Sequence, residues 1–235
     1  MNKSIKTGAL LVAGVFALSG CGSSSEAADS GSGESSPTAA LAVGQDQYTA
    51  EELEAALTAA QQAMGFSGIV DNDASVRAML EMAGFLSVTA TPAQCATLGS
   101  SLFDKTITTG NSAAMEMEGT DALLLVSYED ASVPDERAEI GEQLASDCAE
   151  FELENKGMTI SGAVEALEVS TEAPNTQAYR TTITQPGGKA EIVQVQAYSG
   201  TVSLSVSMFD PEDAAAAVDV AEETINVALA ELAKK

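Results

Sequence analysis

The chain has 235 residues, of which 35 are acidic and 10 are basic, and it contains no histidine and no tryptophan. Its formal charge of −25 argues against nucleic acid and anionic lipid head groups as partners, because such a surface repels both. The lack of histidine excludes Ser-His-Asp and Cys-His catalytic sets and histidine-liganded zinc sites.

The first twenty residues have the layout of a secretory signal. Residues 1–6 carry two lysines and no acid, and residues 8–19 form an apolar run too short to span a bilayer comfortably. The run ends in Leu-Ser-Gly-Cys at residues 18–21, which resembles a bacterial lipobox. The resemblance implies signal cleavage between Gly20 and Cys21, a diacylglyceryl thioether on Cys21, and acylation of the new amine, for example by palmitate. An ordinary cleaved signal with an accidental cysteine is the alternative.

Residues 21–47 are rich in serine, glycine, alanine and acids, a composition that cannot bury enough apolar surface to fold. We therefore expect a lipidated Cys21 followed by a disordered tether, which would hold the protein at the extracytoplasmic face of the cell membrane. The expected domains are a signal peptide at 1–20, the tether at 21–47 and a folded domain at 48–235. Within that domain, we expect an N-terminal helical part at 48–90 and a core at 91–235.

Two cysteines remain once Cys21 carries lipid. Cys95 and Cys148 form an even pair in an oxidising compartment, which favours a disulfide. Closing a loop of this size stabilises the fold by about 4 kcal/mol in the chain-entropy model. Two free thiols, or half of a metal site, are the alternatives that the sequence leaves open.

The first half of the folded domain reads as helix. Residues 49–64 begin with a capping box at Thr49 and Glu52 and carry an apolar stripe. We expect Asp73 to cap a second helix with Val76, Met79, Leu80 and Ala83 facing inward.

A third helix is expected over residues 91–103. Thr91 would cap it and Pro92 would occupy its first position. Residues 132–151 return to helix after a buried strand at 121–128, and their apolar side is formed by Ile140, Leu144, Cys148 and Phe151.

Most of the remaining chain reads as strand, with runs at 159–170, 176–184, 190–198 and 201–209. In the last run, Val202, Leu204, Val206 and Met208 alternate with three serines, which is typical of a half-buried strand. A final helix is expected after residue 209, with Asp210 as cap, Pro211 as first residue and Asp213 in support. Its inner stripe is formed by Val218, Ala221, Ile225, Leu229 and Leu232.

This order of elements predicts an α+β fold with a single disulfide, in which helices cover one face of an antiparallel meander sheet. The stretch from "TPAQC" through a strand, a helix ending at Cys148, several strands and a terminal helix is similar to the extracellular sensor domain of PknH-type kinases of actinobacteria. Related lipoproteins share this layout. The similarity covers residues 91–235, and it implies a non-catalytic domain with a cleft for a cell-envelope ligand.

One short segment resembles part of a metal-binding loop. Asp71, Asp73 and Ser75 resemble the start of a calcium loop, but Val76 and Met82 occupy the positions that require glycine and glutamate. A helix cap is therefore expected there, and neither a metal nor a cofactor.

Two pairs of side chains have a functional and a structural interpretation. Glu116 and Glu118 could act as an acid–base pair, although a solvated face is the simpler interpretation. Met115 and Met117 are interpreted as core residues and not as a ligand stripe. The arginines could clamp an anion, but they more often balance neighbouring acids; they are Arg77, Arg137 and Arg180.

The sequence therefore predicts a lipid-anchored, extracytoplasmic, non-enzymatic module that binds or senses an envelope lipid, glycan or protein. The ligand-binding residues are not identified at this stage. A lipid or glycolipid carrier is the first alternative, and it requires an apolar cavity between sheet and helices. A hydrolase that uses carboxylates alone requires two acids that converge in a cleft. A purely structural envelope protein is the third alternative.

Overall fold

The structure is a computed structural model that describes residues 43–83, 89–96, 109–155, 158–185 and 187–235. Residues 40–235 form one compact unit. The expected lipidation at Cys21 and cleavage after Gly20 lie outside the described residues. Among the described helices, none combines the length and the apolar character that a bilayer-spanning segment requires.

The described strands form one antiparallel sheet of nine strands, in the order β1-β3-β4-β9-β8-β7-β6-β5-β2. Strands β5 to β9 follow one another as a meander, and β4 pairs with β9 to attach the β3–β4 hairpin. The strand bounds are β1 Val70–Asp71, β2 Thr89–Thr91, β3 Asn111–Glu116, β4 Ala122–Ser127, β5 Phe151–Asn155, β6 Met158–Leu167, β7 Asn175–Gln185, β8 Gly188–Ser199 and β9 Val202–Phe209. The α+β class and the antiparallel meander are confirmed.

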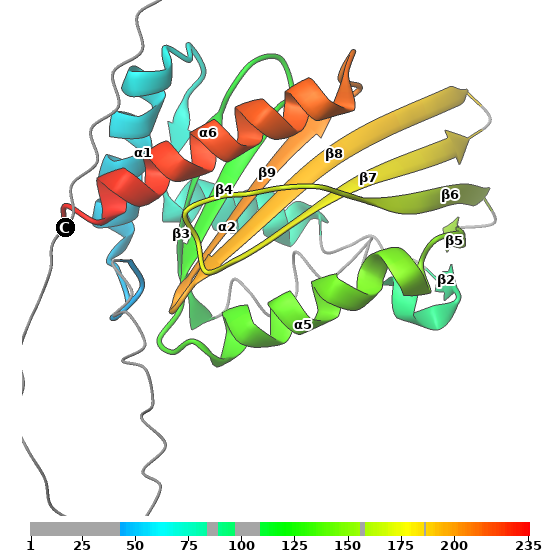
Figure 1. Cartoon of the computed structure of the whole chain (residues 1–235), viewed down its shortest axis with the longest axis horizontal. Coiled ribbons are helices and arrows are strands. Elements are labelled where there is room, and N and C mark those ends of the chain that lie inside the picture. The colour runs from blue at the N-terminus through cyan, green and yellow to red at the C-terminus, as the bar shows by residue number, and fades with distance from the viewer. Residues whose placement is uncertain (1–42, 84–88, 97–108, 156–157, 186) are drawn as a thin grey trace, which may run out of the picture. The chain divides into compact units, whose positions relative to one another are not determined.

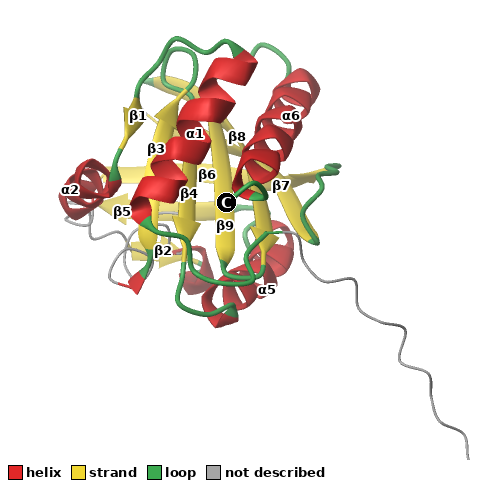
Figure 2. Cartoon of the chain, turned by 90° about the vertical axis from the view of Figure 1, so that its left-hand side faces the viewer, coloured by secondary structure: helices red, strands yellow, loops and turns green. Residues whose placement is uncertain are grey.

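Helices lie on both faces of the sheet, whereas the sequence predicted one covered face. The helix bounds are α1 Ala50–Met64, α2 Asp73–Ala83, α5 Ser132–Asp147 and α6 Ala214–Leu232, with a 3₁₀ helix η1 at Ala93–Ala96. Helices α1 and α6 lie side by side over one face, and α5 lies on the opposite side of the strands (Figures 1 and 2). The hydrogen bond from Gln177 of β7 to the α5 backbone places α5 on the face opposite Ala178, which packs in the core under α1 and α6.

The main core lies between the sheet and helices α1 and α6. The capping box at Thr49 and Glu52 is confirmed, and Gly65 ends α1 in the left-handed region at a φ of 73°. All five residues of the predicted inner stripe of α6 are buried. The cap of α6 is Asp213, whose side chain accepts hydrogen bonds from two first-turn amides, and not Asp210 as predicted. Asp210 instead extends the β8–β9 pairing, with hydrogen bonds to Glu191.

Helix α2 lies beside β3 with a different orientation from the one predicted. The side chain of Asn72 accepts the N–H of Ser75 and takes the capping role predicted for Asp73. Val76 is buried as expected, but Met79 is 44% exposed. The buried stripe of this short helix is therefore narrower than the sequence predicted.

The predicted third helix is replaced at its start by a strand. Thr91 belongs to β2 and pairs with Glu152 of β5, so it cannot serve as a helix cap. Pro92 follows a cis peptide bond, and η1 begins only at Ala93. Residues 97–103 of this prediction lie outside the described residues.

The helix predicted over 132–151 ends earlier than expected. It ends at Asp147, and Phe151 starts β5 because its backbone pairs with Gly162. Ile140 is 42% exposed, whereas Pro134, Ala138 and Gly141 form the buried side of α5. Tertiary pairing therefore overrides the helical periodicity at this end.

The folded unit includes residues 43–47, which the sequence assigned to the tether. Val43 is buried in the main core and its carbonyl accepts the Ser199 hydroxyl. Gly44 fits against β8 so closely that a Cβ would lie 1.9 Å from the Ser199 carbonyl oxygen. Its φ of 82° also favours glycine. The segment is thus fastened to the turn between β8 and β9.

Candidate functional site

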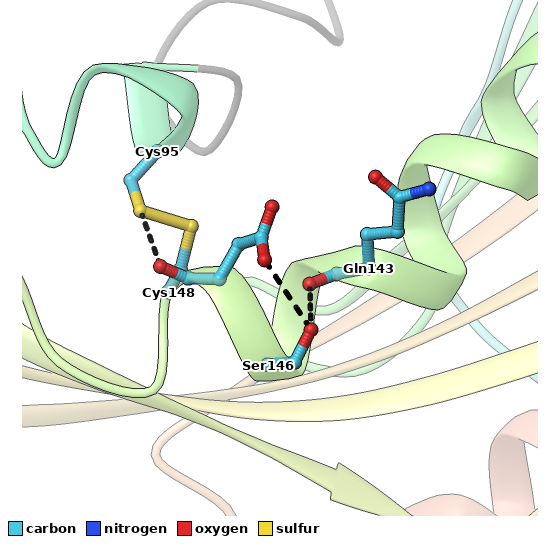
Figure 3. Close-up of a disulfide and its surroundings, with 5 residues drawn as sticks. Cys95, Gln143, Ser146 and Cys148 are labelled. Atoms are coloured by element: carbon cyan, nitrogen blue, oxygen red, sulfur yellow. Dashed lines mark hydrogen bonds between the residues drawn. A yellow bond between two sulfur atoms is a disulfide. The ribbon is translucent and has the colours of Figure 1, made fainter.

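The predicted cysteine pair forms a disulfide. Cys95 of η1 and Cys148 at the end of α5 are bonded, with their Cα atoms 5.7 Å apart (Figure 3). Both side chains are buried in a second, smaller core with Phe151, Val164 and Tyr179. The Asp147 carbonyl oxygen lies 3.5 Å from the Cys95 sulfur. The bond joins the edge strand β2 and η1 to α5, which is a structural role.

The acidic residues considered as catalytic or metal-binding groups do not form such a site. Glu116 and Glu118 are exposed. Asp73 accepts hydrogen bonds from Arg77 and from Ser112, so its carboxylate joins α2 to β3. Within the described part of the chain, no group of three His, Cys, Asp or Glu side chains could hold a metal ion.

The methionines and arginines have structural surroundings. Met115 and Met117 are buried in the main core. Arg77 pairs with Asp73, and Arg180 of β7 pairs with Glu165 of β6. Arg137 of α5 lies near Tyr198 and opposes the effect of burial on the pKa of that tyrosine. These arginines balance neighbouring groups, in line with the simpler prediction.

A polar patch on the α5 side of the sheet is the main feature that the sequence analysis missed. It is formed by Gln194 and Gln196 of β8 and Ser203, Ser205 and Ser207 of β9, and we call it the serine–glutamine face. The register pairs Gln194 with Ser207 and Gln196 with Ser205, so these side chains share one side of the sheet.

The serine–glutamine face contrasts with the reverse side of the same two strands. There, Val193, Val195, Leu204 and Val206 are fully buried in the main core. The alternation predicted a half-buried strand, but Ser203 and Ser205 on the serine side are also only 7% and 9% exposed. Gln194, Gln196 and Ser207 are half-buried, so burial is greatest at Ser203 and decreases toward Ser207.

Two tyrosine–glutamine pairs border the face. The hydroxyl of Tyr179 donates to Gln177 and that of Tyr198 donates to Gln196, both at 2.6 Å. Gln177 also donates to the Ala138 carbonyl of α5 at 2.6 Å, which fixes the helix on the sheet. Burial raises the pKa of both tyrosines, and they stay neutral donors throughout the physiological range.

The polar side chains of the face use little of their hydrogen-bonding capacity. Gln194 Nε2 lies 3.4 Å from the hydroxyl oxygens of Ser205 and Ser207, which is long for a hydrogen bond. Groups of this kind can donate to and accept from a bound polar molecule. The sequence signal was the alternation of serine over 203–207 beside glutamines at 194 and 196, but it does not reveal which side is covered.

A groove on the other side of the sheet is the second candidate site. It has a volume of about 740 Å³ and lies between α6 and the β6–β7 part of the sheet. Its lining residues are Leu167, Glu168, Arg180, Asp213, Ala214, Ala215, Val218, Asp219 and Glu222.

The charged lining of this groove is largely occupied within the protein. Asp213 caps α6, Glu222 accepts the Ser170 N–H at 2.6 Å, and Arg180 pairs with Glu165. An acyl chain in this groove would desolvate charged groups at high cost. The groove therefore does not provide the apolar cavity that a lipid carrier requires.

No family model matches the sequence, and no curated protein is significantly similar to it. Solved structures do give matches. The chain resembles the extracellular domain of PknH. That domain, from Mycobacterium tuberculosis, is 14% identical with a TM-score of 0.46, over 81% of this chain and 98% of the domain. An uncharacterized protein from Mycobacterium smegmatis, the Rv0999 ortholog, is 17% identical with a TM-score of 0.38, over 63% of this chain and 77% of that one.

Proposed function

We propose that the protein is a lipid-anchored, non-catalytic module that binds a cell-envelope ligand at the serine–glutamine face. The observation that carries the binding site is this uncharged polar patch in the middle of the sheet, where Gln194 reaches the hydroxyls of Ser205 and Ser207 only at 3.4 Å. A sheet face with only a stabilising role would be expected to carry apolar side chains under its covering elements, as the opposite face does.

The proposed location is supported by two features. The Leu-Ser-Gly-Cys sequence at residues 18–21 follows a short apolar run, as in lipoprotein signals. The Cys95–Cys148 disulfide is of the kind that persists in oxidising compartments outside the cytoplasm. Two or three acyl chains on Cys21 would then give stable membrane attachment.

The anchor is tested by intact mass measurement of the full chain from a host that processes lipoproteins. We expect a product that begins at Cys21 and carries a diacylglyceryl group, in the membrane fraction. The Cys21→Ala variant should lose both the lipid mass and membrane attachment. An unmodified Cys21 in the wild-type product would contradict the proposed anchor.

The binding function is tested by native mass spectrometry of the same protein, purified from the membranes of its own host. We expect a retained small molecule that disappears from the Gln194→Leu variant. Gln62→Leu is the matched control, because Gln62 is exposed on α1. If the same molecule stays bound to the Gln194→Leu variant, the serine–glutamine face is not the binding site.

A further inference from the structure

Three buried hydroxyl side chains lie at one end of the sheet, outside the serine–glutamine face. Ser127, Ser199 and Thr201 are 0%, 4% and 5% exposed. Ser127 ends β4, Ser199 ends β8, and Thr201 lies in the turn that leads into β9. A buried hydroxyl is costly unless it is hydrogen-bonded, so these side chains indicate that a specific segment binds them. That segment is residues 43–48, which we call the strap.

The first half of the strap is bonded to the turn between β8 and β9. The Ser199 hydroxyl donates to the Val43 carbonyl at 2.8 Å. The Thr201 N–H donates to the Gly44 carbonyl at 2.9 Å, and the Thr201 hydroxyl donates to the Asp46 carbonyl, also at 2.9 Å. Two residues of the turn region therefore bind three carbonyls of the strap.

The second half of the strap is bonded to β4 and β3. Gln47 donates to the Ser127 carbonyl at 3.2 Å, and the Ser127 hydroxyl accepts the Tyr48 N–H at 2.9 Å. Asn111, the first residue of β3, donates to the Tyr48 carbonyl at 2.7 Å. From Val43 to Tyr48, the strap therefore meets β8 and β9 first, then β4 and then β3, which is the order of these strands in the sheet.

Apolar packing adds to these hydrogen bonds. Val43 is buried in the main core, and Tyr48 packs against the same core. Gly44 leaves no room for a side chain, because a Cβ would lie 1.9 Å from the Ser199 carbonyl oxygen. A flexible connection between a tether and helix α1 would need none of these contacts.

We infer that the strap transfers tension: it passes a pull on the N-terminal anchor to the ends of β8, β9, β4 and β3 and keeps this pull off α1. The inference rests on the lipid anchor proposed above, because an anchored chain is pulled from its N-terminal side. A pull that arrives at Val43 meets the bonds to Ser199 and Thr201 first, so the strap opens from Val43 toward Tyr48. Helix α1 begins two residues after Tyr48 and is pulled only once the strap has opened.

The order of these events protects the main core. Leu53 and Leu57 of α1 are fully buried in that core, so a pull applied directly to α1 would act on it at once. Opening the strap instead frees six residues, which lengthen the chain by about 20 Å at about 3.3–3.6 Å per residue. The core stays closed while this length is taken up.

Single-molecule stretching of the full chain tests the inference. The chain is produced without lipid, and Cys21 and a C-terminal tag serve as handles under non-reducing conditions, which keep the Cys95–Cys148 disulfide. We expect a first extension of about 20 Å before the rest of the domain unfolds. A second handle position bypasses the strap. With Cys21→Ser and Glu51→Cys, the pull begins on the first turn of α1, and the first extension should be absent.

Two variants assign the extension to the strap. Ser199→Ala removes the hydroxyl that binds the Val43 carbonyl, so the first extension should occur about tenfold faster at the same force. Gly44→Ala places a Cβ against the Ser199 carbonyl, so its first extension should shift to lower force or be lost. Ser146→Ala makes the same change as Ser199→Ala at an exposed position of α5, and this control should behave as the wild type does. Thermal unfolding without force establishes that each variant is folded.

Three results would overturn the inference. The first is no extension of this size when the pull acts at Cys21, and the second is an extension that neither strap variant changes. The third is an equal loss of unfolding force in Ser199→Ala at both handle positions, which would show a general loss of stability and not a transfer of tension. Failure of the proposed anchor is a separate result, because an unmodified Cys21 in the mass measurement would remove the anchor whatever the stretching experiment shows.

Discussion

Asp73 of α2 joins this helix to Ser112 of β3, which lies 39 residues further along the chain. Its carboxylate accepts the N–H and the hydroxyl of Ser112 at 2.9 and 2.8 Å, and the Arg77 side chain at 2.6 Å. These bonds satisfy part of the edge of β3, where the neighbouring strand β1 has only two residues. Partial burial alone would raise the pKa of Asp73, but the hydrogen bonds from Arg77 and Ser112 outweigh it and hold the pKa below its ordinary value.

This lowered pKa predicts the pH dependence of the Asp73 contribution. A carboxyl whose pKa is lower in the folded state stabilises the fold above its unfolded pKa of about 3.9, and the contribution is lost as the pH falls through the folded value. We expect Asp73→Asn to lower the free energy of unfolding by about 1–2 kcal/mol at pH 7. The difference from wild type should shrink toward zero near the folded pKa.

Urea unfolding at pH 7 and at pH 2.5–3 measures this difference. Asp71→Asn is the matched control, since Asp71 lies two residues away on β1. A difference between wild type and Asp73→Asn that is equally large at both pH values would contradict the assignment.

Gly141 determines how closely α5 approaches the sheet. A Cβ at this position would lie 1.8 Å from Gln177 Oε1 and 2.7 Å from the Tyr179 hydroxyl. Gln177 would have to move, and this movement breaks its bonds to Tyr179 and to the α5 backbone. Alanine is the better helix former by about 1 kcal/mol, but the lost buried hydrogen bonds cost more.

We therefore expect Gly141→Ala to destabilise the fold by about 1 kcal/mol in chemical denaturation. In a Gln177→Ala background, the same change should cost less, because only the 2.7 Å approach to the Tyr179 hydroxyl remains. A double-mutant cycle measures this coupling. Equal effects of Gly141→Ala in the two backgrounds would show that Gln177 does not restrict the position.

At the scale of elements, the disulfide holds a weakly paired edge. Strand β2 has three residues and pairs only with β5 among the described strands. The bond closes a loop with a sequence separation of 53 residues. Replacing Cys95 and Cys148 by alanine should lower the free energy of unfolding by about 4 kcal/mol in the chain-entropy model.

The effect of the disulfide should also be local. Hydrogen exchange should accelerate at Ala90 and Leu153, which pair across β2 and β5, more than at Ala197 in the main core. Reducing the wild-type protein should reproduce the loss of stability, whereas the double variant should not respond to reductant. Uniform acceleration across all strands would contradict a local role.

The elements also show what sequence patterns can predict here. Helix α1, helix α6 and the hairpins of β6 to β9 follow from local signals, namely a capping box, an apolar stripe and alternating residues. The pairing of Thr91 with Glu152 and of Phe151 with Gly162 is set by distant partners, so local periodicity assigned both residues to helices. The burial of the β9 serines was missed for the same reason. Alternation predicts two faces of a strand, but it does not indicate what packs on each.

The disulfide was predictable because cysteine pairing in an oxidising compartment needs only a count. The serine–glutamine face was not, because its members come from two strands whose register decides that they meet. Polar residues on a strand are the expected pattern for an exposed face. Only the burial of Ser203 and Ser205 distinguishes this face from an ordinary solvated one.

At the scale of the whole molecule, the charge of −25 opposes folding, because 10 basic residues cannot neutralise 35 acids. Arg77, Arg180 and Lys234 each pair with an acid, but the helices also carry many exposed glutamates. Repulsion among exposed charges acts over the Debye length, which falls from about 30 Å at 0.01 M salt to about 8 Å at 0.15 M. Screening should therefore stabilise the folded state.

We expect the melting temperature to rise by about 5 °C between about 0.01 M and about 0.5 M sodium chloride, with most of the rise below about 0.15 M. A variant with Glu51→Gln, Glu139→Gln and Glu212→Gln, three exposed positions on or beside different helices, should melt higher at low salt and respond less to added salt. Differential scanning calorimetry measures both effects. A rise that continues linearly above about 0.5 M would indicate general salting-out and not screening. A melting temperature that is constant or falls over the low-salt range would show that repulsion among the acids does not limit the stability of this fold.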